Sequence, residues 1–142
     1  MQERLWLRNT LLIVGGYYLS ALVVVPFWVP IAKLAEGRVY YPGWQTFLME
    51  LFNAVPVLAG AALAGPLAGY FLETNRPALW TVCLGGFVAL CNWSAHHWYV
   101  KPSFSDVAVQ GTKAIVSGGL AAAACSLILK RRRSTAGTGA PA

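Results

Sequence analysis

Residues 107–133 read VAVQGTKAIVSGGLAAAACSLILKRRR, a long apolar run followed at once by four basic residues. A helix crosses the hydrocarbon core of a bilayer with about 20 mostly apolar residues, and this run is long enough. Basic residues next to such a run are attracted to anionic headgroups by about 1 kcal/mol each. The stretch therefore predicts a transmembrane helix over 107–129, with Lys130, Arg131, Arg132 and Arg133 binding anionic lipid headgroups.

Three further segments have the same length and apolar character, at residues 9–32, 44–72 and 78–100. The predicted fold is all-α: a polytopic membrane protein with a four-transmembrane-helix up-down bundle. We expect one domain over residues 1–133. Residues 134–142 are small and polar, which predicts a disordered cytoplasmic tail. The spacing of Ser103 and Asp106 predicts a capping box before the fourth helix.

Composition supports a membrane protein. Of 142 residues, 57% are apolar and 11% are charged, which is under half the charged fraction of about 25% usual in soluble proteins. A soluble domain of this length could not bury so much apolar surface. The first segment is longer than the apolar core of a signal peptide, so we interpret it as a retained anchor. The three cysteines lie in apolar segments without paired spacing, which argues against a redox or metal site.

The distribution of basic residues predicts the orientation. The end that holds both termini carries Arg4, Arg8, Arg76 and the basic run at 130–133, and the opposite end carries Lys33, Arg38 and Lys101. Because cytoplasmic loops are enriched in Lys and Arg, both termini are expected in the cytoplasm of a cell membrane protein. The net charge of +6 comes largely from the basic run, so no nucleic-acid partner is expected.

Small residues and prolines suggest how the helices pack. Small residues repeat every fourth position at Gly16/Ser20, Gly65/Gly69, Gly85/Ala89, Gly118/Ala122 and Gly119/Ala123. Such pairs allow helices to approach closely in lipid. Packing within the chain is the favoured interpretation, and a homodimer face is the alternative. Prolines are expected to bend two helices, at positions 26, 30, 56 and 66.

Polar residues form a stripe on three of the helices, all in the half of the membrane away from the termini. They follow helical spacing at Thr46, Glu50 and Asn53; at Asn92, His96 and Tyr99; and at Asp106, Gln110, Lys113 and Ser117. A charge in hydrocarbon is costly, so we expect Glu50 and Lys113 to pair directly or through His96. The predicted pocket consists of Glu50, Asn53, Asn92, His96, Gln110 and Lys113.

Two interpretations without a ligand remain open for this stripe. The Glu50–Lys113 pair could serve only to set helix register, or Lys113 could extend to the headgroups. His96 beside a carboxylate could titrate near neutral pH, which suggests proton coupling. Adjacent histidines point about 100° apart on a helix, so His96 and His97 are not expected to bind one metal. A haem held by two histidines needs them on opposing helices, so no haem is expected within one chain. No catalytic residues, metal or cofactor are predicted.

Three function classes therefore remain. The first is solute or ion transport, or small-ligand binding, in an outward-facing polar pocket within the membrane. The alternative is a non-catalytic accessory or assembly subunit of a larger membrane complex, in which the stripe is structural. The third is a membrane-embedded lipid-modifying enzyme with His96 and Glu50 as acid and base. An enzyme is the less favoured class, and a homodimer or a larger complex is an expected assembly.

Overall fold

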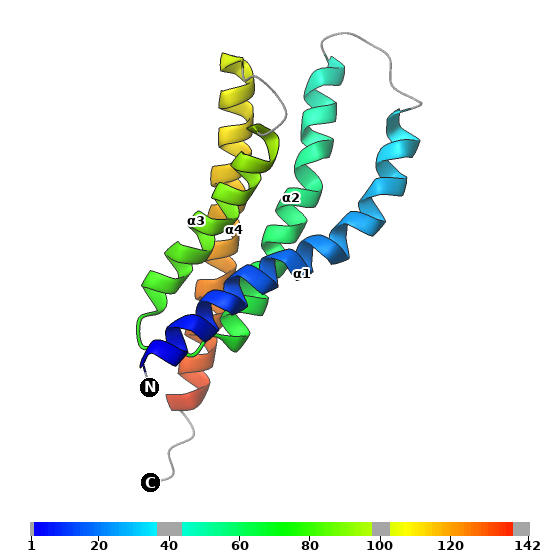
Figure 1. The fold of residues 1–142 in the computed structure, drawn as a ribbon. Coiled ribbons are helices and arrows are strands. Elements are labelled where there is room, and N and C mark those ends of the chain that lie inside the picture. Colours follow the sequence, from blue (N-terminus) through cyan, green and yellow to red (C-terminus); the bar gives the residue numbers. More distant parts are fainter. Residues whose placement is uncertain (1, 37–43, 98–102, 138–142) are drawn as a thin grey trace.

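The computed structural model describes residues 2–36, 44–97 and 103–137, without the side chains of residues 2, 32, 34–36, 44–49, 96 and 97. Four helices account for almost all of these residues: α1 (Gln2–Glu36), α2 (Trp44–Phe71), α3 (Pro77–His97) and α4 (Phe104–Gly137) (Figure 1). Each helix is long and apolar enough to cross a membrane. The prediction of an all-helical chain with four such helices is confirmed.

The capping box explains where α4 begins. The Ser103 hydroxyl accepts a hydrogen bond from the Asp106 amide at 3.2 Å, and Asp106 Oδ2 accepts one from the Ser103 amide at 3.2 Å. These reciprocal bonds satisfy two backbone donors at the helix start, so α4 begins at Phe104, three residues before the predicted span.

At its other end α4 continues through residues 134–137, in the segment predicted as a disordered tail. Here the Ser134 and Thr135 hydroxyls donate hydrogen bonds to the Arg131 carbonyl, at 2.9 and 3.2 Å. These local bonds accompany the extension of the helix. Residues 138–142 lie outside the described part of the chain.

The helices are arranged around α4, which packs against both α2 and α3. α1 packs mainly on α2 and only touches α3, and among the described residues it makes no packing contact with α4. In Figure 1, α1 crosses in front of the other helices, and the start of α1 lies at the same end as the end of α4. α2 and α3 barely touch each other, and both pack against α4. α4 therefore lies along one side of the space between α2 and α3.

Glycines make the close contacts with α4. A Cβ atom added to Gly65 would lie 2.5 Å from the Ala121 carbonyl oxygen, and one added to Gly85 would lie 2.8 Å from the Gly118 carbonyl oxygen. These distances leave no room for a side chain, so the helix backbones themselves are in contact. At Gly65, Gly69, Gly85 and Gly118 the small residues serve packing within the chain, as the favoured interpretation expected.

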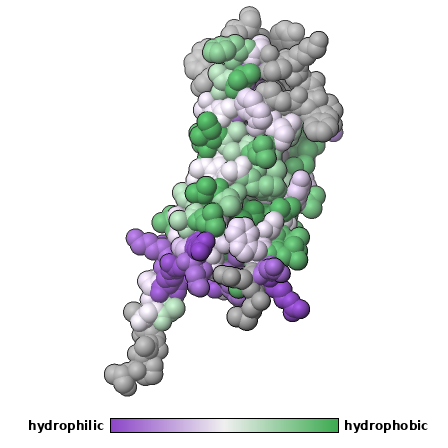
Figure 2. Space-filling view, turned by 60° about the vertical axis from the view of Figure 1, so that its left-hand side comes forward, coloured by the Kyte–Doolittle hydropathy of each residue, from purple (hydrophilic) through white to green (hydrophobic). Residues whose placement is uncertain are grey.

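The outer surface of the four helices is largely apolar. Phe27 and Leu22 on α1 are 74% and 70% exposed, and Figure 2 shows hydrophobic residues over the visible middle of the molecule. Hydrophilic residues gather around the end that carries the termini (Figure 2). The prolines lie inside continuous helices, and α1, which holds Pro26 and Pro30 in its second half, curves along its length (Figure 1).

Candidate functional site

An ion pair joins α2 and α4 in the half of the molecule away from the termini. The Lys113 ammonium donates to Oε2 of Glu50, so the predicted pairing of these two residues is present. The Lys113 side chain is 16% exposed, whereas the Glu50 side chain is 36% exposed. The pair is therefore not sealed inside the protein.

The ion pair borders a cavity of about 350 Å³ between α2 and α3. Residues from three helices line it: Glu50, Asn53, Val57, Asn92, Ala95, Gln110 and Lys113. Five of the six predicted pocket residues thus meet at one cavity. Within each helix the predicted residues follow helical spacing and share one face, and the five that line the cavity border the space between α2 and α3.

The sixth predicted residue, His96, lies one turn beyond Asn92 on α3, but its side chain lies outside the described residues. The same is true of Thr46 and Tyr99. Asp106 does not reach the cavity lining, because its carboxylate is held by Ser103 in the capping box.

A chain of hydrogen bonds crosses the molecule at Asn92. The Tyr17 hydroxyl donates to Asn92 Oδ1 at 2.6 Å, Asn92 Nδ2 donates to the Ser117 hydroxyl at 2.8 Å, and that hydroxyl donates to the Ala114 carbonyl at 3.0 Å. The Tyr17 and Phe87 rings also pack in a T-shaped arrangement, with centroids 5.8 Å apart. The amide of Asn92 is thereby fixed by α1 and α4 while it lines the cavity.

Tyr17 is a residue that sequence reasoning missed. It belongs to a face of α1 that carries the buried residues Asn9, Ile13, Gly16 and Ser20. These positions follow helical spacing, and the face combines polar and small residues within an otherwise aliphatic helix. That pattern was a readable signal that this face of α1 packs against protein.

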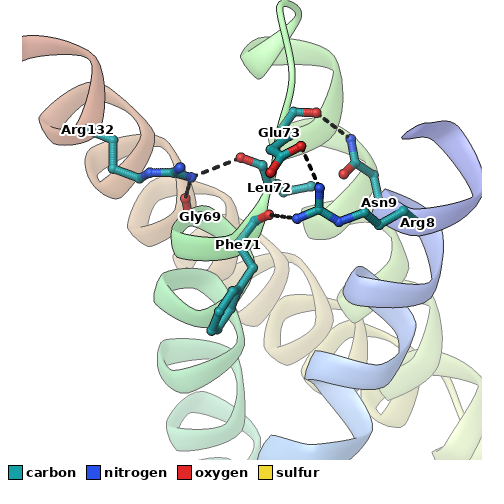
Figure 3. A network of polar contacts seen from close by, with 7 residues as sticks. All are labelled: Arg8, Asn9, Gly69, Phe71, Leu72, Glu73 and Arg132. Carbon is teal, nitrogen blue, oxygen red and sulfur yellow. Dashed lines mark hydrogen bonds and ion pairs between the residues drawn. The ribbon is translucent and has the colours of Figure 1, made fainter. Parts of the chain in front are cut away.

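A second network of polar contacts lies at the end that carries the termini (Figure 3). Arg8 on α1 forms an ion pair with Glu73 at 2.5 Å and donates a hydrogen bond to the Phe71 carbonyl at 3.2 Å. Asn9 donates to the Glu73 carbonyl at 3.0 Å. The last carbonyls of a helix lack partners within the helix, so α1 supplies donors where α2 ends.

Arg132 reaches the same helix end from α4. It donates to the Leu72 carbonyl at 3.0 Å and to the Gly69 carbonyl at 3.4 Å (Figure 3), and its guanidinium lies 5.9 Å from the centroid of the Tyr70 ring. The sequence placed Arg132 among the headgroup ligands. In the structure its guanidinium donates to carbonyls at the end of α2, and Lys130 and Arg133 line a cavity of about 340 Å³ beside the start of α3.

The cavity between α2 and α3 offers one carboxylate, one ammonium and three carboxamides, which together can bind both donors and acceptors of a small polar solute. Its described lining contains no serine, threonine or cysteine. Nor do the described residues bring together three or more side chains able to hold a metal ion. No protein family, curated protein or solved structure matches this chain.

Proposed function

We propose that this chain is an integral membrane protein whose four helices cross the bilayer as an up-down bundle, with both termini in the cytoplasm. In this orientation the cavity at Glu50 and Lys113 opens in the outer half of the membrane. Its function is to bind a small polar solute or ion there, either for transport or as a receptor site.

One observation supports this proposal over a purely structural ion pair: the pair borders a polar cavity. A pair that only sets helix register gains from tight packing, because a dry and fully bonded pair needs no space beside it. Here the Glu50 carboxylate remains partly exposed, and carboxamides of Asn53, Asn92 and Gln110 surround the same space. Such a space can hold water, which reduces the cost of placing charges at membrane depth.

Cysteine accessibility tests the proposal. Asn53→Cys places a thiol in the cavity lining, and Val55→Cys places a matched thiol two residues along α2 on the exposed apolar surface. Both are made in a background in which Cys83, Cys91 and Cys125 are replaced by alanine. We expect a membrane-impermeant thiol reagent, added outside intact cells, to modify N53C at least tenfold faster than V55C, because thiols react as thiolates in water.

Equal protection of both cysteines would show a sealed, structural ion pair and would contradict the proposed pocket. Reaction of N53C only from the cytoplasmic side, in inverted vesicles, would contradict the proposed orientation.

We also propose that the basic run at residues 130–133 binds anionic lipid. A cavity at the other end of the molecule supports this proposal. Lys130 and Arg133 face one cavity, and its lining also includes Pro77, Ala78 and Leu129. Two cations beside apolar residues can bind a negatively charged headgroup, while the acyl chains of the lipid contact the apolar residues.

An accessory subunit is the second candidate function, and the position of α1 favours it. α1 packs mainly on α2 and leaves large side chains such as Phe27 and Leu22 exposed. This face could contact a partner protein as well as lipid. Co-purification of one protein at fixed stoichiometry in mild detergent, lost in a Phe27→Ala/Leu22→Ala variant, would support this candidate. Purification as a single species would exclude it.

A further inference from the structure

A larger cavity lies at the opposite end from the polar pocket, at the end that carries the termini. It has a volume of about 510 Å³ and is formed by the start of α1, the turn between α2 and α3, and the start of α3. Its chemically distinctive lining residues are Glu3, Trp6, Asn9, Glu73, Arg76 and Trp80. None of them belongs to the pocket at Glu50 and Lys113.

Two tryptophans place this cavity at headgroup level. The rings of Trp6 and Trp80 lie 4.6 Å apart between centroids. Both residues sit at the start of an apolar span, since the span of α1 begins at Glu3 and that of α3 begins at Pro77. Tryptophan favours this position because its ring is apolar and its N–H is polar. The cavity is therefore located where lipid headgroups lie beside the protein.

Two charged side chains in the cavity lining, one of each sign, are available to bind a ligand. Glu73 is occupied, because it pairs with Arg8. Glu3 and the guanidinium of Arg76 make no ion pair or side-chain hydrogen bond with any other part of the chain that the structure describes. A ligand that carries both a cation and an anion complements these two groups.

Asn9 is a buried polar side chain in the wall of this cavity. It lines the cavity, is only 2% exposed, and uses its Nδ2 on the Glu73 carbonyl. Its Oδ1 is buried and receives no hydrogen bond from any described residue. An oxygen with no accessible surface cannot be reached by a ligand in the cavity, so the choice of cation rests on the exposed Glu3 carboxylate, which accepts hydrogen bonds from N–H donors. A primary ammonium has three such donors, whereas a quaternary ammonium has none.

We propose that this cavity binds the headgroup of an ethanolamine phospholipid. The ammonium lies against the tryptophan rings and donates to Glu3, while the phosphate is held by Arg76. The acyl chains then continue along the apolar surface beside α1 and α3. This site depends on the proposed membrane insertion but not on the polar pocket in the outer half.

Native mass spectrometry of the intact protein in detergent tests the site. Dioleoyl phosphatidylethanolamine, phosphatidylcholine and phosphatidylglycerol are titrated separately, so that the acyl chains are the same and only the headgroup varies. We expect the ethanolamine lipid to bind about tenfold more tightly than the choline lipid, because only its ammonium can donate charge-assisted hydrogen bonds.

Substitutions of two exposed residues, Glu3 and Arg76, distinguish the contact with the ammonium from the contact with the phosphate. Glu3→Gln should abolish the preference for ethanolamine over choline, because it removes the carboxylate that accepts from the ammonium. Arg76→Gln should weaken both lipids by a similar factor, because both carry the phosphate. Arg4→Gln, which changes a neighbouring charge outside the cavity lining, should leave all affinities unchanged. A thermal melting curve for each variant verifies that the fold is retained.

Equal affinity for the ethanolamine and choline lipids in the unmodified protein would overturn the proposal, as would a preference that survives Glu3→Gln. Saturable binding of free phosphoethanolamine, with no headgroup preference among the lipids, would assign the site to a soluble ligand and overturn the lipid assignment. Thiol modification of N53C should be the same with and without Glu3→Gln, so a failure of this site is distinguishable from a failure of the polar pocket.

Discussion

The hydroxyl of Tyr17 on α1 donates a hydrogen bond to Asn92 on α3, a residue 75 positions away in the sequence. α1 and α3 otherwise touch only slightly, so this bond ties α1 to the helix pair that flanks the polar cavity. Asn92 in turn donates a hydrogen bond to the Ser117 hydroxyl of α4. The orientation of one cavity amide therefore depends on a helix that does not line the cavity.

Tyr17→Phe should destabilise the protein by about 0.5–1.5 kcal/mol, because it leaves Asn92 Oδ1 without its donor while it retains the ring contact with Phe87. The measurement is thermal unfolding in a mild detergent. Tyr18→Phe is the matched control, since Tyr18 is exposed and neighbours Tyr17. Equal melting temperatures for the two variants would show that the hydrogen bond contributes nothing.

Neutralising one member of the Glu50–Lys113 pair should destabilise the protein, because the other charge then remains partly buried without its ion-pair partner. We expect about 1–3 kcal/mol for Glu50→Gln or Lys113→Gln, which is less than for a fully buried pair because Glu50 is partly exposed. The exchange Glu50→Lys with Lys113→Glu should restore more than half of the loss. A double-mutant cycle in detergent measures this coupling, and additive effects would show that Lys113 does not depend on Glu50.

Gly85 and Gly86 are adjacent on α3 but differ in their surroundings. A Cβ at Gly85 meets the Gly118 carbonyl and the Ala122 side chain, whereas a Cβ at Gly86 meets nothing within 4 Å. Gly85→Ala should therefore cost about 1–3 kcal/mol by forcing α3 and α4 apart. Gly86→Ala should be neutral or stabilise by up to about 1 kcal/mol through helix propensity. The reverse order of melting temperatures would contradict the packing described for these two helices.

Arg131 and Arg132 are neighbours whose substitution should have different consequences. Arg132→Gln should lower stability in detergent by about 1 kcal/mol, because it removes the donor to the last carbonyls of α2. The Arg131 side chain has no hydrogen-bond or ion-pair partner within the described residues, so Arg131→Gln should change stability by less than about 0.5 kcal/mol.

The same pair of variants also tests the lipid proposal for the basic run. If Arg131 binds anionic headgroups, Arg131→Gln should reduce the stabilisation that phosphatidylglycerol gives over phosphatidylcholine in melting curves. A loss of stability in detergent alone, without phosphatidylglycerol, would instead indicate that Arg131 has a structural partner.

The helices were predictable because their signal is local. Each predicted span overlaps one helix of the structure, and the boundaries shift where a cap or a polar segment extends the helix, as at Ser103 and Ser134. Lines of polar residues on each helix were predictable for the same reason, since a period of 3.6 residues follows from backbone geometry. The meeting of Glu50 with Lys113 was anticipated because two opposite charges in apolar helices have few other partners.

The arrangement around α1 was not predictable from the same signals. Tyr17 was missed because its hydroxyl has a partner only when α1 crosses toward α3, and nothing in residues 2–36 identifies which helix lies opposite. The hydrogen bonds from Arg132 to the end of α2 were also not predicted, because the basic run is uniform in sequence and its members differ only in their tertiary surroundings. In both cases the deciding contact joins residues 60 or more positions apart.

Hydropathy and helical periodicity, read from the sequence alone, determined that this chain forms four apolar helices long enough to cross a membrane, three of which carry a polar face. The tertiary structure decided that α4 packs between α2 and α3, that polar residues of these three helices border one cavity, and that Tyr17 of α1 holds the amide of Asn92 by a hydrogen bond. The physical reason is that hydropathy and period act within one helix, whereas the choice of neighbour depends on close contacts such as Gly85 with Gly118, which exist only once two distant segments have met.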